Sequence, residues 1–100
     1  MTEAGDIRYE LTLFVSGATE HSAHAITNAT ALCETYLSGR HRLSFVDLHD
    51  DPGAALSNQV VVAPTLVKHL PLPVCRVVGD LSDTETVLAA LGLPDATLAT

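Results

Sequence analysis

The feature that most constrains the fold is a strand-like stretch interrupted by three prolines. Pro64 directly precedes one strand-like run, and Pro71 and Pro73 separate that run from the next, so all three prolines lie within ten residues. Proline has no amide hydrogen to donate to a sheet, so it belongs at an edge or in a turn. Residues 65–67 and 74–78 are therefore predicted to be strands joined by a rigid turn. A second interpretation is a segment whose pairing is weak enough to rearrange.

The first half of the chain predicts a strand, a helix and a second strand. Residues 9–15 alternate between apolar and polar, as a half-buried strand does. A helix is expected from about residue 20 to 38, with Thr19 or Ser22 as its N-cap. Residues 42–48 are apolar on both faces, which favours a central parallel strand. The apolar stripe expected along the helix consists of Ile26, Ala29, Cys33, Tyr36 and Leu37.

The second half predicts a short helix, the two proline-linked strands and a last helix. Residues 50–52 are typical of a helix start, and Ser82 with Glu85 forms a capping box for the last helix. Gly92 is expected to end that helix. The order βαβαββα is that of a thioredoxin-like α/β fold with a central mixed sheet. In that fold Pro64 would precede the third strand, which makes it a candidate cis peptide.

Length and charge exclude several classes of protein. The 100 residues predict one domain, residues 9–92, with frayed ends at residues 1–8 and 93–100. Five Lys and Arg against 12 Asp and Glu give a formal charge of −7, which argues against a nucleic-acid partner. No apolar run approaches the roughly 18 residues of a membrane span. No signal peptide is visible at the N-terminus, so a cytoplasmic protein is expected.

The two cysteines do not form a recognisable redox motif. A thioredoxin carries its dithiol between the first strand and the first helix, and the matching residues 17–22 contain no cysteine. Cys33 lies on the helix stripe and Cys75 opens a strand. We favour two small buried hydrophobes over a redox pair. The thiol alternative is a redox protein that uses Cys75, which is followed by Arg76.

Two groups of polar residues are candidates for other chemistry. The group on the first helix is a candidate metal site, and the group after the second strand is a candidate cation site or acid–base pair. They are Glu20, His21 and His24 on the first helix, and Asp47, His49, Asp50 and Asp51 after the second strand. Because zinc usually needs three or four converging ligands, we favour surface histidines and helix capping. The sequence has no nucleophile elbow, P-loop or dinucleotide fingerprint. No catalytic, metal or cofactor residue is therefore assigned, and no enzyme is expected.

The proline segment and the turn after it form one recognisable pattern. Residues 64–66 read Pro-Thr-Leu, residues 70–76 read Leu-Pro-Leu-Pro-Val-Cys-Arg, and residues 79–82 read Gly-Asp-Leu-Ser. This pattern resembles the KaiB family of clock proteins. Residues 13–17 are similar to the first strand and turn of that family, and the resemblance extends over residues 9–91.

The resemblance implies a non-enzymatic protein that acts through partners. KaiB proteins dock on the KaiC ring ATPase, a P-loop enzyme, where they compete with a sensor histidine kinase and sequester KaiA. They occur in two folds, a tetrameric ground state and a thioredoxin-like form that binds KaiC. A homo-oligomer, either a tetramer or a dimer, is therefore possible, but a monomer is expected in the thioredoxin-like state. We expect the contact surface on the exposed side of the first helix and along the edge from Pro64 to Arg76. The expected contact residues are His24, Gln59, Lys68 and Arg76.

The end of the last helix differs from the family in a way that favours one of the two folds. Where the family often has Gly and then Asp, this chain has Ala90 and Gly92. Alanine favours a helix over glycine by about 1 kcal/mol, and Gly92 is a good C-terminal stop. We therefore expect the chain to rest mainly in the thioredoxin-like fold rather than in the tetrameric ground-state fold. The fold-determining residues are predicted to be Pro64, Pro71, Pro73, Gly79, Asp80, Ala90 and Gly92.

One further functional alternative remains open at this point. A stand-alone adaptor or sensor domain, like the KaiB-like N-terminal domain of clock histidine kinases, would have the same thioredoxin-like fold. It would be monomeric and would not change its fold.

Overall fold

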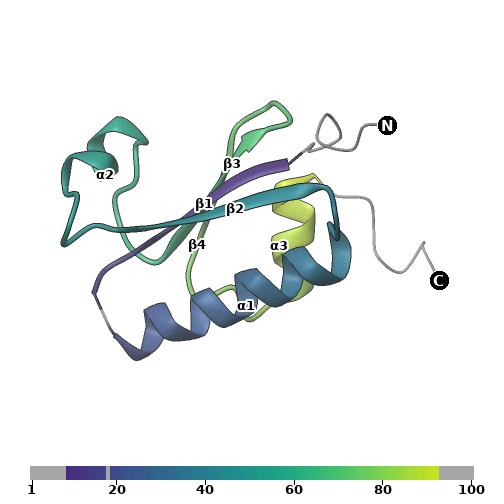
Figure 1. Cartoon of the computed structure of the whole chain (residues 1–100), viewed down its shortest axis with the longest axis horizontal. Helices are drawn as coiled ribbons and strands as arrows, with labels where there is room; N and C mark the ends of the chain where they lie inside the picture. The colour runs from purple at the N-terminus through teal and green to yellow at the C-terminus, as the bar shows by residue number, and fades with distance from the viewer. Residues whose placement is uncertain (1–8, 18, 93–100) are drawn as a thin grey trace.

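The computed structural model describes residues 9–17 and 19–92, so the expected frayed ends lie outside the described residues. Helices and strands follow one another in the expected βαβαββα order (Figure 1). They are β1 (Tyr9–Val15), α1 (Glu20–Tyr36), β2 (His41–Asp47), α2 (Gly53–Ser57), β3 (Thr65–Leu70), β4 (Cys75–Val78) and α3 (Thr84–Leu91). No helix in the described ranges is long and apolar enough to cross a membrane.

The four strands form one mixed sheet in the order β2-β1-β3-β4. β1 is parallel to β2 and antiparallel to β3, and β3 is antiparallel to β4. The prediction that residues 42–48 form a central strand is wrong, because β2 lies at the edge of the sheet. β3 returns to pair with the inner side of β1, which makes β1 and β3 the central strands. Phe45 of β2 is accordingly 48% exposed.

One face of the sheet is covered by α1 and α3 and holds the main core (Figure 1). Fourteen buried residues make up this core. They are Leu11, Leu13, Val15, Ala25, Ala29, Leu32, Cys33, Leu37, Leu66, Val77, Leu81, Val87, Leu88 and Leu91. The predicted helix stripe was correct for Ala29, Cys33 and Leu37 but wrong for Ile26, which is 38% exposed. The buried face is turned toward Ala25 instead, the residue before Ile26.

The opposite face of the sheet, which we call the α2 face, carries a much smaller core. Phe14, Val60 and Val67 are buried there, and Ala54 and Ala55 of α2 pack against them. Further along the same face the sheet is polar: Thr12 Oγ1 lies 3.0 Å from His69 Nε2.

Short polar side chains begin and end the helices. Thr19 is the N-cap of α1, as one of the two alternatives predicted, and its hydroxyl accepts from the Ser22 amide at 3.1 Å. The predicted Ser82 cap of α3 is wrong. Asp83 is the N-cap, with its carboxylate accepting from the Thr86 amide at 3.3 Å. Gly92 ends α3 in the left-handed conformation, as expected.

The proline segment forms the β3–β4 hairpin and the approach to it. The peptide bonds before Pro64, Pro71 and Pro73 are all cis. Pro64 is buried at the start of β3, whereas Pro71 and Pro73 are exposed in the turn. Gly79 follows β4 with a φ of +114°, which favours glycine, and its amide donates to the Pro64 carbonyl at 2.9 Å. The second half of the segment is thereby tied back to its start.

Candidate functional site

Two of the four expected contact residues form one surface feature. The Arg76 guanidinium donates from Nε to the Asn58 carbonyl at 3.0 Å and from Nη2 to Gln59 Oε1 at 3.1 Å. Gln59 and Arg76 are both exposed. The register of β4 against β3 pairs Arg76 with Val67, which places the arginine on the α2 face. Arg76 therefore fixes the C-terminal end of α2 to the edge strand β4.

His24 lies on the other layer of the molecule, on the exposed side of α1. Next to it, His21 Nε2 is 3.6 Å from the Asp80 carboxylate. Hydrogen bonds from the Ser82 hydroxyl and amide, and then the charges of His21 and His24, hold the pKa of Asp80 below its ordinary value. Asn28 donates to the Asp80 carbonyl at 2.7 Å. The first half of α1 is thus joined to the Gly79–Ser82 turn.

Lys68 does not lie on the surface. Its side chain is 3% exposed, and its ammonium donates to the Leu91 carbonyl at 2.9 Å. A cation is favourable there, because carbonyl dipoles point out of the C-terminal end of a helix. Lys68 is buried because β3 is a central strand. The expected contact edge from Pro64 to Arg76 is therefore corrected: only the turn and β4 lie at the edge of the sheet.

The loops that follow β1 and β2 are joined by one carboxylate. Asp47 Oδ1 accepts from the Gly17 amide at 3.1 Å and from the His49 amide at 2.9 Å. The His49 bond and then the Gly17 bond lower the pKa of Asp47. Ser16 Oγ lies 3.3 Å from His49 Nε2. The favoured structural role of Asp47 fits this geometry, since its contacts are with the backbone of its own turn and of the β1–α1 loop.

In the same loops, a side chain at Gly17 would be crowded by His49. Gly17 has a φ of +67°, and a Cβ there would be 3.1 Å from His49 Cε1. At this place a thioredoxin carries its dithiol, whereas here Gly17 lies next to the His49 ring and Thr19 caps α1. Asp47 thus joins the ends of β1 and β2, and α1 and α2 each follow one of these ends in the chain. We call this part of the molecule the loop end.

The two cysteines are free thiols in different surroundings. Cys33 is completely buried, and burial, followed by the charge of Glu34, raises its pKa to about 11. Cys75 is partly exposed, and its thiol donates to the Pro73 carbonyl at 3.5 Å. Within residues 9–17 and 19–92, no three His, Cys, Asp or Glu side chains are grouped to hold a metal.

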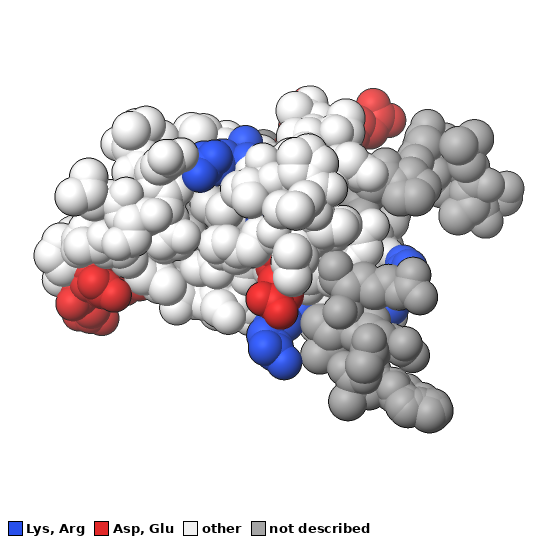
Figure 2. Space-filling model, turned by 90° about the horizontal axis from the view of Figure 1, so that it is seen from above, with Lys and Arg blue, Asp and Glu red and all other residues white. Residues whose placement is uncertain are grey.

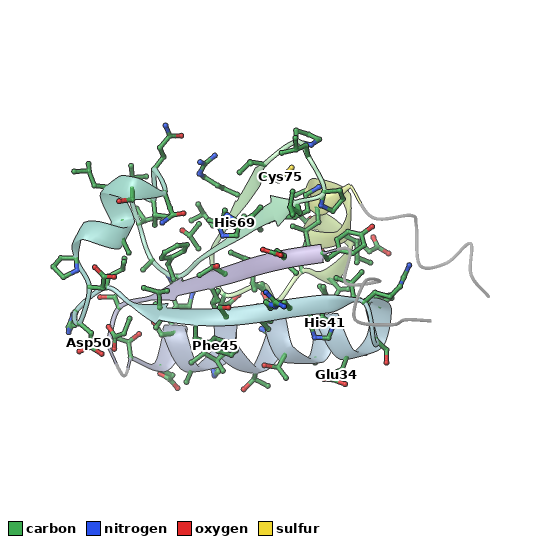
Figure 3. All side chains as sticks on the ribbon, turned by 45° about the horizontal axis from the view of Figure 1, so that its top comes forward. Glu34, His41, Phe45, Asp50, His69 and Cys75 are labelled. Atoms are coloured by element: carbon green, nitrogen blue, oxygen red, sulfur yellow. The ribbon has the colours of Figure 1, made fainter. Side chains whose placement is uncertain are left out.

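Sequence reasoning missed one part of this surface, the α2 patch, which we define as Leu56, Val61 and Val62. These side chains are 86%, 89% and 47% exposed. Asp50 and Asp51, the acidic rim, are exposed just before α2. Figure 3 places Asp50 at the end of the molecule where α2 lies, and Figure 2 shows an acidic group at that end of a largely uncharged face. An apolar residue in a sequence suggests burial, so only the fold reveals this patch.

Comparisons with known proteins agree with this architecture. The KaiB domain model matches residues 12–93. The circadian clock oscillator protein KaiB of Synechococcus elongatus is 40% identical over 85 residues, which cover 85% of this chain and 83% of that protein.

Solved structures with similar backbones have low sequence identity and show the fold alone. The N-terminal domain of SasA from Synechococcus elongatus has a TM-score of 0.69 at 22% identity, covering 89% of this chain and 88% of that domain. The thioredoxin Deadhead of Drosophila melanogaster has a TM-score of 0.68 at 15% identity, covering 90% of this chain and 84% of that protein. The thioredoxin-like fold is therefore confirmed.

Proposed function

The chain belongs to the KaiB family, and on that premise we propose that it is a regulator that docks on a KaiC-type ring ATPase. KaiB proteins are non-enzymatic, so docking would change the signalling of the ATPase rather than any substrate of this chain. The relative named above is a circadian clock oscillator protein. We extend that role to this chain, as a component of a circadian clock or of a related timing or stress response. KaiA and a histidine kinase that competes for the same ATPase are further proposed partners.

The observation that carries the proposal is the exposure of His24 and Gln59, two of the contact residues expected from the resemblance. β1 and β2 run parallel, so α1 and α2 both begin near the ends of these strands. His24 lies in the second turn of α1, and Gln59 lies just after α2. A thioredoxin-like domain without a dithiol in its first loop fits such a docking role.

The charge of the chain bears on the choice of ATPase. Family members tend to be basic where this chain has His24 and Gln59, and the whole chain has a formal charge of −7. Charge complementarity mainly sets the rate and the specificity of encounter. We therefore propose a KaiC-type ATPase whose docking surface is less acidic than that of a clock KaiC.

Binding to the KaiC-type ATPase encoded in the same genome tests the proposal. The purified chain and ATPase are mixed with ATP and, separately, with ADP, and the complex is measured by light scattering and biolayer interferometry. A complex is expected in at least one nucleotide state. His24→Ala or Gln59→Ala should weaken it by about fivefold or more, as loss of an interface contact does. Thr35→Ala, on the far part of α1, is the matched control. Absence of any complex with the native chain would overturn the proposal.

A second candidate function is supported by the similarity to the SasA domain over most of the chain. In this alternative the chain is a monomeric adaptor or sensor domain that keeps one fold. Mass measurement over a range of concentrations separates the two candidates. A KaiB that changes its fold should show a tetramer at high concentration, whereas an adaptor should remain a monomer throughout.

A further inference from the structure

The segment that carries the α2 patch also holds one buried anchor, Val60. Val60 is 7% exposed and packs with Phe14 and Val67. Leu56 and Val61, on either side of it in the sequence, are the two most exposed large apolar side chains in the described chain. Val60 already packs this segment against the core, so Leu56 and Val61 are not needed for that contact. Contiguous exposed apolar patches are typical of contact sites, and these two side chains flank one short turn.

The segment that carries the patch is held firmly. The Val60 amide donates to the Ala55 carbonyl at 2.8 Å, and Asn58 Nδ2 donates to the Ala54 carbonyl at 2.9 Å. The two Arg76 bonds to Asn58 and Gln59 fix the same turn to β4. A surface that is already ordered loses little conformational entropy on binding. Leu56 and Val61 are therefore presented in a defined arrangement before any partner arrives.

Carboxylates lie at the start of α2, the helix that carries Leu56. Asp50 and Asp51 are exposed directly before α2, and Asp47 and Glu20 lie at the same end of the sheet. Arg76 is the cation on the other side, and its guanidinium is already bonded to Asn58 and Gln59. If two copies of this chain met through their α2 patches, the two acidic rims would also meet and repel each other. A second copy is therefore a poor occupant, and a surface of opposite charge is a good one.

We propose that the α2 patch is a docking site for a partner segment with apolar side chains bordered by Lys or Arg. Leu56 and Val61 pack against the apolar side chains, and the acidic rim pairs with the basic border. The inference rests on the proposed function for the identity of the partner, which is the KaiC-type ATPase. It adds the chemistry of the contact: this ATPase carries a basic border where it touches α2.

A peptide probe tests the chemistry of the site without the ATPase. The isotope-labelled chain is titrated with an amphipathic Leu/Lys helix and with the matched Leu/Glu helix, and amide shifts are followed by NMR. The Leu/Lys peptide should shift residues 50–62 and bind at least tenfold more tightly, with an affinity that falls as salt is added. The double variant Leu56→Ser/Val61→Ser should abolish this binding, and Leu72→Ser, an exposed apolar control in the β3–β4 turn, should not. Equal binding of both peptides, or shifts that map elsewhere, would overturn the inference.

The ATPase complex provides the second arm. Leu56→Ser/Val61→Ser should weaken the complex at least tenfold, and Asp50→Asn/Asp51→Asn should slow association severalfold and reduce its salt dependence. If the native chain binds and the double serine variant binds equally well, the inference is wrong and the proposed function stands. If the native chain binds no ATPase, the proposed function is wrong and the peptide result alone decides the inference. Self-association of the native chain that the serine variant loses would make a second copy the occupant and overturn the inference.

Discussion

The two faces of the sheet differ in what covers them. α1 and α3 bury fourteen residues on one face, whereas α2 and the turn after it bury only three on the other. α1 has 17 residues and a side-chain cap, but α2 has five residues and none. Helices this short are marginal in isolation, so α2 depends on Val60 and on the Arg76 bonds. The comparison indicates that stability resides mainly in the helix-covered face and that the α2 face is available for recognition.

The largest expected effect comes from placing one substitution on each face. Leu13→Ala, in the main core, should lower the free energy of unfolding by about 3 kcal/mol, because it removes a fully buried side chain and leaves a cavity. Leu56→Ala, on the α2 face, should change it by less than about 0.5 kcal/mol. Urea unfolding measures both. Similar losses for the two variants would contradict the division between the faces.

The next effect concerns the start of α3 on the helix-covered face. Asp83→Ala should cost about 1 kcal/mol, since it removes the carboxylate that accepts from the Thr86 amide. Ser82→Ala, one residue earlier, should cost less than about 0.5 kcal/mol because Ser82 is not the cap. The same unfolding measurement compares the two. A larger loss of unfolding free energy for Ser82→Ala than for Asp83→Ala would show that Ser82 is the cap, as the sequence predicts.

A smaller and local effect is expected on the α2 face. Arg76→Met should increase hydrogen exchange of the amides in residues 54–60 by about tenfold, because the bonds to Asn58 and Gln59 are lost. The amides of α1 should exchange as before. Arg42→Met, on the opposite edge strand, is the matched control. Uniform acceleration throughout the chain would show that Arg76 stabilises the whole fold rather than α2.

The smallest effect is expected from acid, because the carboxylates involved are exposed. Hydrogen bonds lower the pKa of Asp47, Asp80 and Asp83 in the folded state. The stability that they contribute is present above the ordinary Asp pKa of about 3.9 and is lost as the pH falls through the folded-state values. Unfolding midpoints between pH 6 and pH 2 should therefore decrease, and Asp47→Asn should make that decrease shallower. An unchanged pH profile in the variant would exclude Asp47 as a contributor.

The order of elements could be predicted because its signals are local. Alternation of apolar residues, short polar caps and prolines each report on a few neighbouring residues. The place of β2 at the edge could not be predicted, because it depends on which strand pairs with the other side of β1. The burial of Lys68 also depends on the strand order, because it is the central position of β3 that buries this residue. A lysine in the sequence gives no sign of such a position. Whether Ser82 or Asp83 is the cap depends on a difference of one residue in where α3 begins.

The candidate site was only partly accessible from sequence. The resemblance pointed to Gln59 and Arg76, but their mutual hydrogen bond joins two segments 17 residues apart and needs the fold. Leu56 and Val61 were not singled out, because apolar residues beside a short helix are expected to pack inside. Whether such a residue packs inside or outside depends on the whole sheet beneath it.

The strand order also has a consequence for synthesis on the ribosome. β1 emerges first yet occupies the middle of the sheet, and its pairing with β3 joins Glu10 to Leu70. While the chain is being translated, β1 and β2 can pair, but the inner edge of β1 stays open until β3 has left the exit tunnel. Unpaired edges of this kind promote aggregation of nascent chains. A stalled or truncated product that ends before β3 should therefore depend on chaperones far more than the finished protein does.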